Sequence, residues 1–119
     1  MEATETAKKR STHFMVPQAM SDKLRLLSRL TRIRQAVYIR EALRDGLAKY
    51  DAGGAAPEGM EPVTGRLLSV VPRVPVDGLE KLKALAHRTR IRESEWWRIF
   101  VADMLGKYSA QFERELEAA

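Results

Sequence analysis

The sequence predicts a mainly α-helical fold with a short two-stranded antiparallel β-ribbon, built from two β-α-α units that form an intramolecular pseudo-dimer. Three observations support this prediction. The chain repeats itself, each repeat begins with an alternating stretch that ends in proline, and two stretches of helical periodicity follow. With 119 residues, the chain is one ordinary domain or two small units that share a core.

The repeat is visible first in the tetrapeptide TRIR, which occurs at residues 31–34 and again 58 residues later at 89–92. At this offset, residues 11–50 align without a gap with residues 69–108 and are identical at 15 of 40 positions. Unrelated stretches would share roughly two or three. The chain is therefore predicted to be an internal duplication, with TRIR as the connector between the two helices of each unit.

The repeat and the composition set the expected domain boundaries. Between the copies, DAGGAAPEGMEPVTG is rich in Gly, Ala and Pro, so a flexible linker with a reach on the order of 20 Å is expected there. The predicted organisation is a flexible basic N-terminal arm (1–10), unit 1 (11–50), the linker (51–65), unit 2 (66–112) and a polar C-terminal tail (113–119).

Unit 1 is expected to open with a strand over residues 11–17, STHFMVP. One face of this strand carries Thr12, Phe14 and Val16, and the other carries Ser11, His13 and Met15. A helix from Gln18 to about Leu30 is indicated by the spacing of Met20, Leu24, Leu27 and Leu30. The second helix is marked by Tyr38, Ile39, Ala42, Leu43, Leu47 and Tyr50.

Unit 2 follows the same order, with a strand near Ser69–Val74 and a helix that begins around Val76. Pro72 occupies an inward strand position and removes one hydrogen-bond donor from the ladder. The last helix begins at about Glu93 and is apolar on a broad face, so burial on more than one side is expected. Trp96 and Trp97 are expected in the core rather than as a platform for stacking bases.

Neither unit is expected to be stable alone. A single strand has no hydrogen-bond partner within its own unit, and about 40 residues bury too little surface. Two units in one chain solve both problems if their strands pair antiparallel and four helices cover one face of the ribbon.

The charge of the chain suggests a polyanionic partner. The formal net charge is +5, and residues 1–50 carry eleven Lys and Arg against five Asp and Glu. Nucleic acid is the natural partner for such an excess, although solubility alone also explains a modest one. The longest apolar runs are too short to span a bilayer or to form a secretory signal, so the cytoplasm is the expected location.

The sequence gives little indication of enzymatic chemistry. The chain has no cysteine, hence no disulfide and no thiolate metal site. His13 and His87 fall in different elements without a carboxylate at metal-ligand spacing, and no glycine-rich phosphate loop follows a strand. We therefore expect no enzyme, no metal and no cofactor.

The motifs of both units resemble the ribbon-helix-helix superfamily of the MetJ and Arc repressors. In unit 1 the resemblance rests on VPQAMSDKLRLLSRL followed by AVYIREALRDGL, where Ile39–Leu43 is similar to the common second-helix motif. In unit 2 it rests on RVPVDGLEKLKALA and SEWWRIFVADML, with Ser94 and Glu95 at the usual Ser-Glu. Two units in one chain are similar to the rarer tandem members, including TraY-type accessory proteins of conjugation.

The resemblance implies sequence-specific binding of double-stranded DNA, as a transcriptional regulator or a relaxosome-type accessory factor. The ribbon would enter the major groove, and its outward side chains would contact base edges. The implied base-contacting residues are Ser11, His13, Met15, Ser69, Val71 and Arg73. The implied phosphate-contacting residues are Lys8, Lys9, Arg10, Arg32, Arg34, Gln35, Arg90, Arg92 and Ser94. An ordinary exposed surface position is the competing interpretation for Arg73, His13, the TRIR arginines and residues 8–10. Arg40 and Arg98 match each other in the repeat, and a structural ion pair is the alternative for them.

The sequence also departs from the family pattern, in both units. Met15 and Val71 are apolar where members usually carry a polar or basic residue, and Glu93 and Glu95 repel DNA near the second phosphate site. Unit 2 is therefore expected to read bases more weakly, which predicts a non-palindromic site. The chain is expected to be a monomer in solution, with possible side-by-side assembly on DNA.

A second hypothesis is a ribbon-helix-helix scaffold turned to protein binding, as an antitoxin-like or adaptor module. In that case Met15, Val71, Leu67 and Leu68 would form an apolar contact surface.

Overall fold

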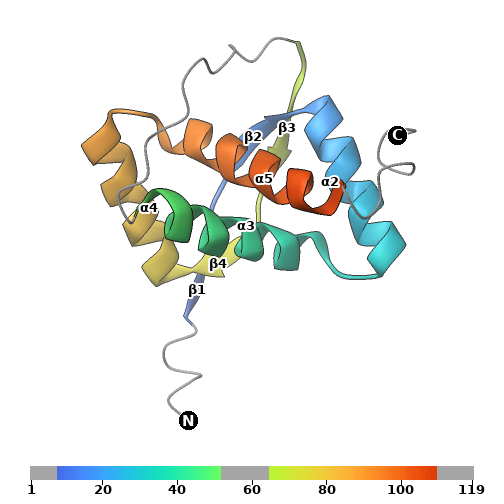
Figure 1. Ribbon diagram of the computed structural model, residues 1–119, viewed down its shortest axis with the longest axis horizontal. Helices are drawn as coiled ribbons and strands as arrows, with labels where there is room; N and C mark the ends of the chain where they lie inside the picture. Colours follow the sequence, from blue (N-terminus) through green and yellow to red (C-terminus); the bar gives the residue numbers. More distant parts are fainter. Residues whose placement is uncertain (1–7, 52–64, 110–119) are drawn as a thin grey trace.

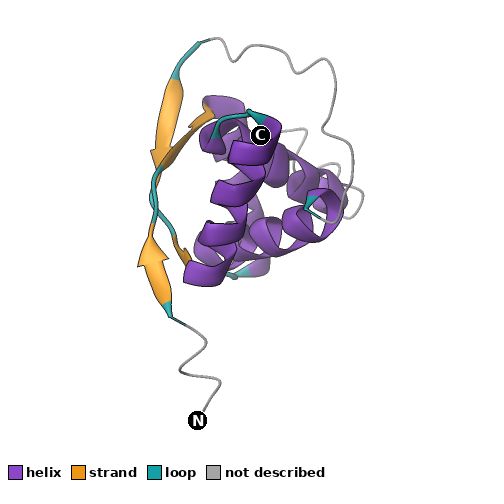
Figure 2. Ribbon diagram, turned by 90° about the vertical axis from the view of Figure 1, so that its left-hand side faces the viewer, coloured by secondary structure: helices purple, strands orange, loops and turns teal. Residues whose placement is uncertain are grey.

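The computed structural model describes residues 8–51 and 65–109. Within these ranges, a thin β-ribbon lies along one side of a layer of helices (Figure 1, Figure 2). The elements in chain order are β1 (Lys9–Ser11), β2 (Phe14–Pro17), α2 (Gln18–Thr31), α3 (Gln35–Tyr50), β3 (Leu67–Val70), β4 (Arg73–Pro75), α4 (Val76–Thr89) and α5 (Glu93–Ser109). The predictions of a mainly helical fold and of antiparallel strand pairing are confirmed.

The strands of the first half pair with those of the second half. β1 pairs antiparallel with β4, with Ser11 opposite Arg73, and β2 pairs antiparallel with β3, with Met15 opposite Ser69. Both pairs keep one register, so the two short sheets form a single ribbon interrupted at its middle. Continued across the interruption, this register places His13 opposite Val71 at the centre of the ribbon.

Pro72 explains the interruption. The amide of Thr12 donates to the carbonyl of Pro72 at 3.0 Å, but Pro72 has no N–H with which to return the bond. Continuous strands over residues 11–17 and Ser69–Val74 were expected. Each is instead split into two short strands, because the ladder loses a donor at its centre.

The ribbon also begins earlier than expected. Lys9 and Arg10 belong to β1, and the carbonyl of Lys8 accepts a hydrogen bond from the amide of Val76 at 3.0 Å. The expectation that residues 1–10 form a flexible arm is therefore wrong for residues 8–10. The strand extends to them because Val74 and Pro75 supply partners on the opposite chain segment. Three segments lie outside the described residues: 1–7, most of the expected linker (52–64), and 110–119, which includes the expected C-terminal tail.

Proline and arginine mark the ends of the first helix in each half. Pro17 and Pro75 end their strands and occupy the N-cap positions of α2 and α4, with φ near the value that the pyrrolidine ring imposes. Arg32 and Arg90 end the same helices in the left-handed region, with φ of 60° and 59°. TRIR is thus the helix–helix connector in both halves, as predicted.

The core lies between the inner face of the ribbon and the helices. Trp96, Trp97 and Phe100 of α5 are at most 1% exposed, which confirms that the tryptophans are core residues. Phe14 of β2 stacks on Trp97 with ring centroids 4.6 Å apart. Leu30, expected on the buried face of α2, is instead 40% exposed, because it lies at the last turn of that helix, beyond the ribbon and α5.

Several contacts occur twice, 58 residues apart. The Tyr38 hydroxyl donates to Thr31 Oγ1 at 2.6 Å, and Trp96 Nε1 donates to Thr89 Oγ1 at 3.0 Å. Between α3 and α5, Lys49 pairs with Asp103 at 3.6 Å and Lys107 pairs with Asp45 at 3.2 Å. At these positions, the two halves of the repeat therefore make corresponding contacts.

No described helix has the length and apolar character needed to cross a membrane.

Candidate functional site

The outer face of the ribbon brings together the six residues predicted to contact bases. Because side chains alternate along a strand, Ser11, His13 and Met15 point away from the helices, as do their partners on the second segment. Ser11 is paired with Arg73 and Met15 with Ser69, and the register shared by the two strand pairs places His13 opposite Val71 between them. A hydrogen bond between His13 Nε2 and Ser69 Oγ links the central pair to the next one.

These six side chains differ in exposure and in chemistry. Ser11, His13, Ser69 and Arg73 are exposed and offer hydrogen-bonding groups, and Val71 is 63% exposed. Met15 is less exposed than the other five, since its side chain is half-buried. An exposed strip of hydroxyl, imidazole and guanidinium groups on a two-stranded ribbon has the width and the donors to read base edges in a major groove.

The basic residues at the start of the ribbon are divided between its two faces. Lys9 is at an alternate position to Ser11, so both side chains point to the outer face of the ribbon, whereas Lys8 and Arg10 are at the positions in between and point the other way. All three are exposed. Since β1 is paired with β4, the backbone holds these charges in place at one end of the ribbon.

A hollow of about 270 Å³ connects the ribbon to the N-terminus of α3. It is lined by Ser21, Arg25, Gln35, Ala36, Ile39, Ser69, Val70, Val71 and Pro72. No side chain caps α3, and no acidic residue lies in its first turn. The hollow therefore combines a guanidinium, hydroxyls and the positive end of a helix dipole, which suits an anion such as a phosphate.

The corresponding position in the second half is different. Phe14 occupies the position that corresponds to Pro72 of the hollow, and its ring stacks on Trp97. The first turn of α5 carries Glu93 and Glu95, whose negative charge favours the helix but repels an anion. Ser94, predicted to contact phosphate, is half-buried between these two glutamates. The two ends of the site are thus electrostatically unequal.

The connector between α2 and α3 and the connector between α4 and α5 lie at opposite ends of the molecule (Figure 1). Arg32, Arg34, Arg90 and Arg92 are all exposed. Arg34 stands directly before α3, next to Gln35 of the hollow, and Arg92 stands directly before α5. Each connector therefore presents two cations beside the N-terminus of a helix.

Arg40 and Arg98 have a role that sequence reasoning missed. Arg40 Nη1 donates to the carbonyl of Arg73 at 3.1 Å, and Arg98 Nη1 donates to the carbonyl of Met15 at 3.2 Å. Met15 and Arg73 correspond at the 58-residue offset, so each arginine holds the equivalent ribbon position of the other half. Within residues 8–51 and 65–109, neither arginine has a carboxylate partner, so these contacts with the ribbon backbone, and not ion pairs, are what the described residues show.

The structure also corrects the proposed apolar contact surface. Leu68 lies opposite Val16, which is 1% exposed, and therefore on the inner face of the ribbon. By the same alternation, the side chains of Leu67, Met15 and Val71 point to the outer face. The four residues do not share one face, because odd and even positions of a strand point in opposite directions.

Sequence reasoning also missed Arg25 and Ser21. They are one turn apart on α2, and nothing in their local pattern indicates that this face of the helix meets Ser69 and Val71.

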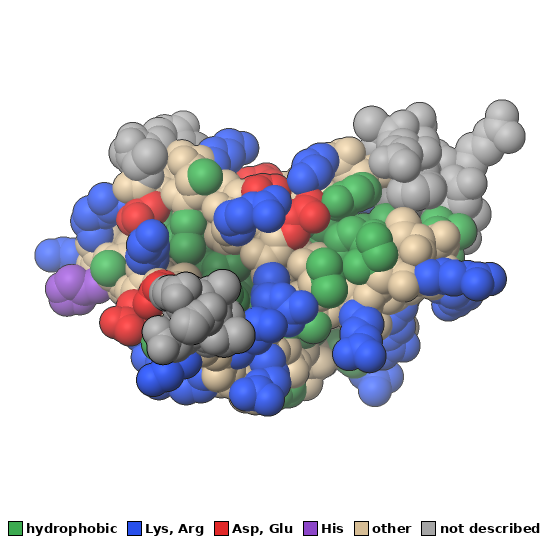
Figure 3. Space-filling view, turned by 90° about the horizontal axis from the view of Figure 1, so that it is seen from below, with side chains coloured by type: hydrophobic (Ala, Val, Ile, Leu, Met, Phe, Trp, Pro, Cys, Tyr) green, Lys and Arg blue, Asp and Glu red, His purple; other side chains and the backbone are tan. Residues whose placement is uncertain are grey.

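Positive charge is spread over the ribbon side of the molecule. In Figure 3, Lys and Arg side chains line the lower edge, where the ribbon lies, and most Asp and Glu side chains lie higher in the view. Among the described residues, no three His, Cys, Asp or Glu side chains come together as metal ligands. The groups with shifted pKa values (Asp45, Lys49, Tyr50, Lys107 and Tyr108) lie instead on α3 and α5.

The comparisons with known proteins agree with the first half of this description. Residues 8–51, from the start of the ribbon to the end of α3, match the model of a family described as "Ribbon-helix-helix domain". The search of curated proteins and the search of solved structures gave no match.

Proposed function

We propose that this chain, whose residues 8–51 match a ribbon-helix-helix domain, binds double-stranded DNA with its β-ribbon in the major groove. The two halves act as a single-chain pseudo-dimer, since each supplies one strand segment and two helices. The observation that carries the proposal is the outer face of the ribbon, where the shared register of the two strand pairs brings the six predicted base-contacting residues together.

Each part of the site has a distinct task in this proposal. Arg73 donates to a guanine edge, and Ser11, His13 and Ser69 supply further hydrogen bonds. Met15 and Val71 contact thymine methyl groups. The hollow at α3, with Arg25 and Gln35, holds a backbone phosphate, and the connector arginines add phosphate contacts that fix the protein on the duplex.

The inequality of the two halves supports a non-palindromic target. Unit 1 has an uncapped helix N-terminus and a hollow, whereas unit 2 has Glu93 and Glu95 at the equivalent place. A protein with unequal phosphate sites and unequal strands distinguishes the two directions along a duplex. Such a protein suits a regulator at an asymmetric operator, or a relaxosome-type accessory factor of the TraY kind.

The decisive experiment compares Arg73→Ala with the unchanged protein. Duplexes are first selected from a random pool, and the dissociation constant of the selected site is then measured against a scrambled duplex by fluorescence anisotropy across a salt series. The unchanged protein is expected to prefer the selected site, with affinity that falls steeply with salt. Arg73→Ala is expected to lose about 1–3 kcal/mol of that preference, the value of one good base contact.

Lys49→Ala is the matched control, because it also removes one exposed positive charge, but from the contact between α3 and α5. It should keep the preference for the selected site. If no sequence is enriched from the pool, or if Arg73→Ala discriminates as well as the unchanged protein, the ribbon is not the reader.

A further inference from the structure

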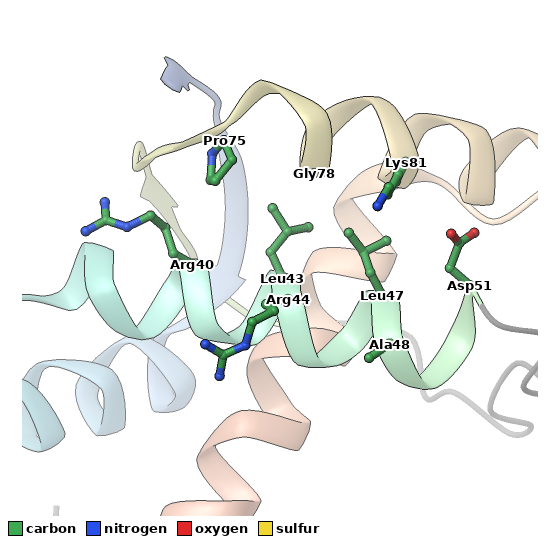
Figure 4. A pocket seen from close by; sticks show the side chains of 9 residues that line it. All are labelled: Arg40, Leu43, Arg44, Leu47, Ala48, Asp51, Pro75, Gly78 and Lys81. Atoms are coloured by element: carbon green, nitrogen blue, oxygen red, sulfur yellow. The ribbon is translucent and has the colours of Figure 1, made fainter. Parts of the chain in front are cut away.

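Arg40 binds the ribbon at an edge where the ladder supplies no hydrogen bond. In an antiparallel pair of strands, hydrogen-bonded and non-hydrogen-bonded residue pairs alternate. The bond from the Thr12 amide to the Pro72 carbonyl marks a hydrogen-bonded pair, so Arg73, the next residue, belongs to a non-hydrogen-bonded pair. Figure 4 shows Arg40 extending from α3 beside Pro75, the last residue of β4. The Arg73 carbonyl points away from the partner strand, and Arg40 Nη1 donates to it at 3.1 Å.

The backbone at Arg73 depends on this bond because the ladder next to it is incomplete. On one side of Arg73, Pro72 accepts a ladder bond but has no N–H with which to return one. On the other side, Val74 continues the ladder opposite Arg10. The ladder therefore restrains Arg73 fully on one side only, and the bond from Arg40 supplies a further restraint at the incomplete place.

Arg98 makes the corresponding bond in the other half and provides an internal comparison. Arg98 Nη1 donates to the carbonyl of Met15 at 3.2 Å. Met15 lies between Phe14 and Val16, which both belong to β2 and are paired with residues of β3. The ladder therefore restrains Met15 on both sides, so the loss of Arg98 should displace this part of the ribbon less.

We propose that Arg40 is a positioning residue for base recognition: it holds the backbone of Arg73 so that the Arg73 guanidinium meets a guanine edge. The proposal rests on the function proposed above, in which Arg73 reads a base. A bidentate bond from arginine to guanine requires the planar guanidinium to align with two acceptors of the base. A small displacement of the Arg73 backbone therefore weakens the recognition of guanine, while the phosphate contacts of the protein remain.

The test compares where Arg40 and Arg73 act along the DNA. Dissociation constants are measured by fluorescence anisotropy for the duplex selected from the random pool and for duplexes with single base-pair substitutions in it. Arg73→Ala identifies the base pair whose substitution no longer weakens binding. Arg40→Met keeps an aliphatic side chain but removes the donor, and it should lower discrimination about fivefold or more at that same base pair.

A double-mutant cycle and a salt series distinguish positioning from other roles. In the Arg73→Ala background, Arg40→Met should change discrimination at that base pair by less than about twofold, since the group that Arg40 positions is already absent. The slope of log affinity against log salt should be the same in Arg40→Met and the unchanged chain, because no phosphate contact is lost. If urea denaturation shows that Arg40→Met is unfolded, Arg40→Gln replaces it, because the glutamine amide ends short of the position of Nη1.

Arg98→Met is the matched control, because it also removes a guanidinium that binds a ribbon carbonyl. It should lower discrimination at any base pair by no more than about twofold, since the ladder holds Met15 on both sides.

The outcomes separate this proposal from the proposed function. If the unchanged chain prefers no duplex, the proposed function fails, and this proposal fails with it. Only this proposal is overturned if Arg73→Ala loses discrimination at one base pair but Arg40→Met keeps it, or if Arg40→Met weakens binding equally to all duplexes. A salt slope reduced in magnitude by about 0.9 in Arg40→Met would likewise overturn it, because Arg40 would then be a phosphate contact. An equal loss of discrimination in Arg98→Met would do the same.

Discussion

Arg32 and Arg90 are residues whose backbone and side chain have conflicting requirements. Both adopt a left-handed φ near 60°, which glycine tolerates far better than arginine. Glycine is also the usual residue at this position after a helix. The presence of arginine at both connectors is therefore best explained by what the side chain does, and phosphate contact is the role proposed for it.

Replacing these arginines by glycine should separate stability from DNA binding. In Arg32→Gly, relief of roughly 1 kcal/mol of backbone strain is offset by the greater freedom of the unfolded chain, so the free energy of unfolding should change by less than about 1 kcal/mol. The slope of log affinity against log salt should fall in magnitude by about 0.9, the value of one phosphate contact. Urea denaturation and a salt titration of DNA affinity measure the two quantities.

Arg32→Asn is the control for backbone effects, because asparagine also tolerates the left-handed region. It should resemble Arg32→Gly in the salt titration. An unchanged slope in both variants would mean that Arg32 is only a surface residue.

At the scale of elements, the close approach of α3 and α5 depends on one glycine. A Cβ at Gly46 would lie 2.2 Å from Phe100 Cδ1, and Phe100 is fully buried. Gly46→Ala should therefore lower the free energy of unfolding by about 1–3 kcal/mol or more through overpacking. Gly106 of α5 has open space around it, so Gly106→Ala should instead raise that free energy by about 0.5–1 kcal/mol through helix propensity.

Urea denaturation of the two variants tests whether their effects on the free energy of unfolding have opposite signs. Equal effects of Gly46→Ala and Gly106→Ala would contradict the packing of α3 against α5.

The contact between α3 and α5 also predicts how stability depends on pH. Burial, and the hydrogen bond to Asp103, raise the pKa of Tyr50. Burial, and the hydrogen bonds to Glu41, raise the pKa of Tyr108. The hydrogen bond to Glu41 raises the pKa of Lys107 as well. A group whose pKa is raised by folding stabilises the fold fully below its unfolded value, and that contribution is lost as the pH rises through the folded value.

Stability should therefore fall as the pH rises beyond about 10, the ordinary pKa of tyrosine and lysine. Urea midpoints measured between about pH 8 and 11.5 test this expectation. Tyr108→Phe should flatten the decline, because it removes one of the titrating groups. A midpoint that is independent of pH in this range, or a decline of the same steepness in Tyr108→Phe, would exclude the mechanism.

At the scale of the whole molecule, the pairing of strands from the two halves makes the assembly intramolecular. β1 and β2 find their partners on β4 and β3 of the same chain, so no second copy is needed to complete the ribbon. We expect sedimentation to give the monomer mass of 13.5 kDa at micromolar concentration, and a melting temperature that does not change with protein concentration. A dimer whose melting temperature rises with concentration would show that strands exchange between chains.

The sequence by itself determined the order of elements, the proline-ended strands, the TRIR connectors, the buried tryptophans and the outward parity of the six ribbon residues. These features follow from local periodicity, and the 58-residue repeat allowed each half to be checked against the other. Only the tertiary structure decided the split in the ribbon, the hollow that joins Arg25 to the strands, the bonds from Arg40 and Arg98 to the opposite half, and the close contact of Leu43 with Gly78. Each of these depends on which residues of one half face which residues of the other. A short-range sequence pattern does not encode contacts between residues that lie so far apart in the chain.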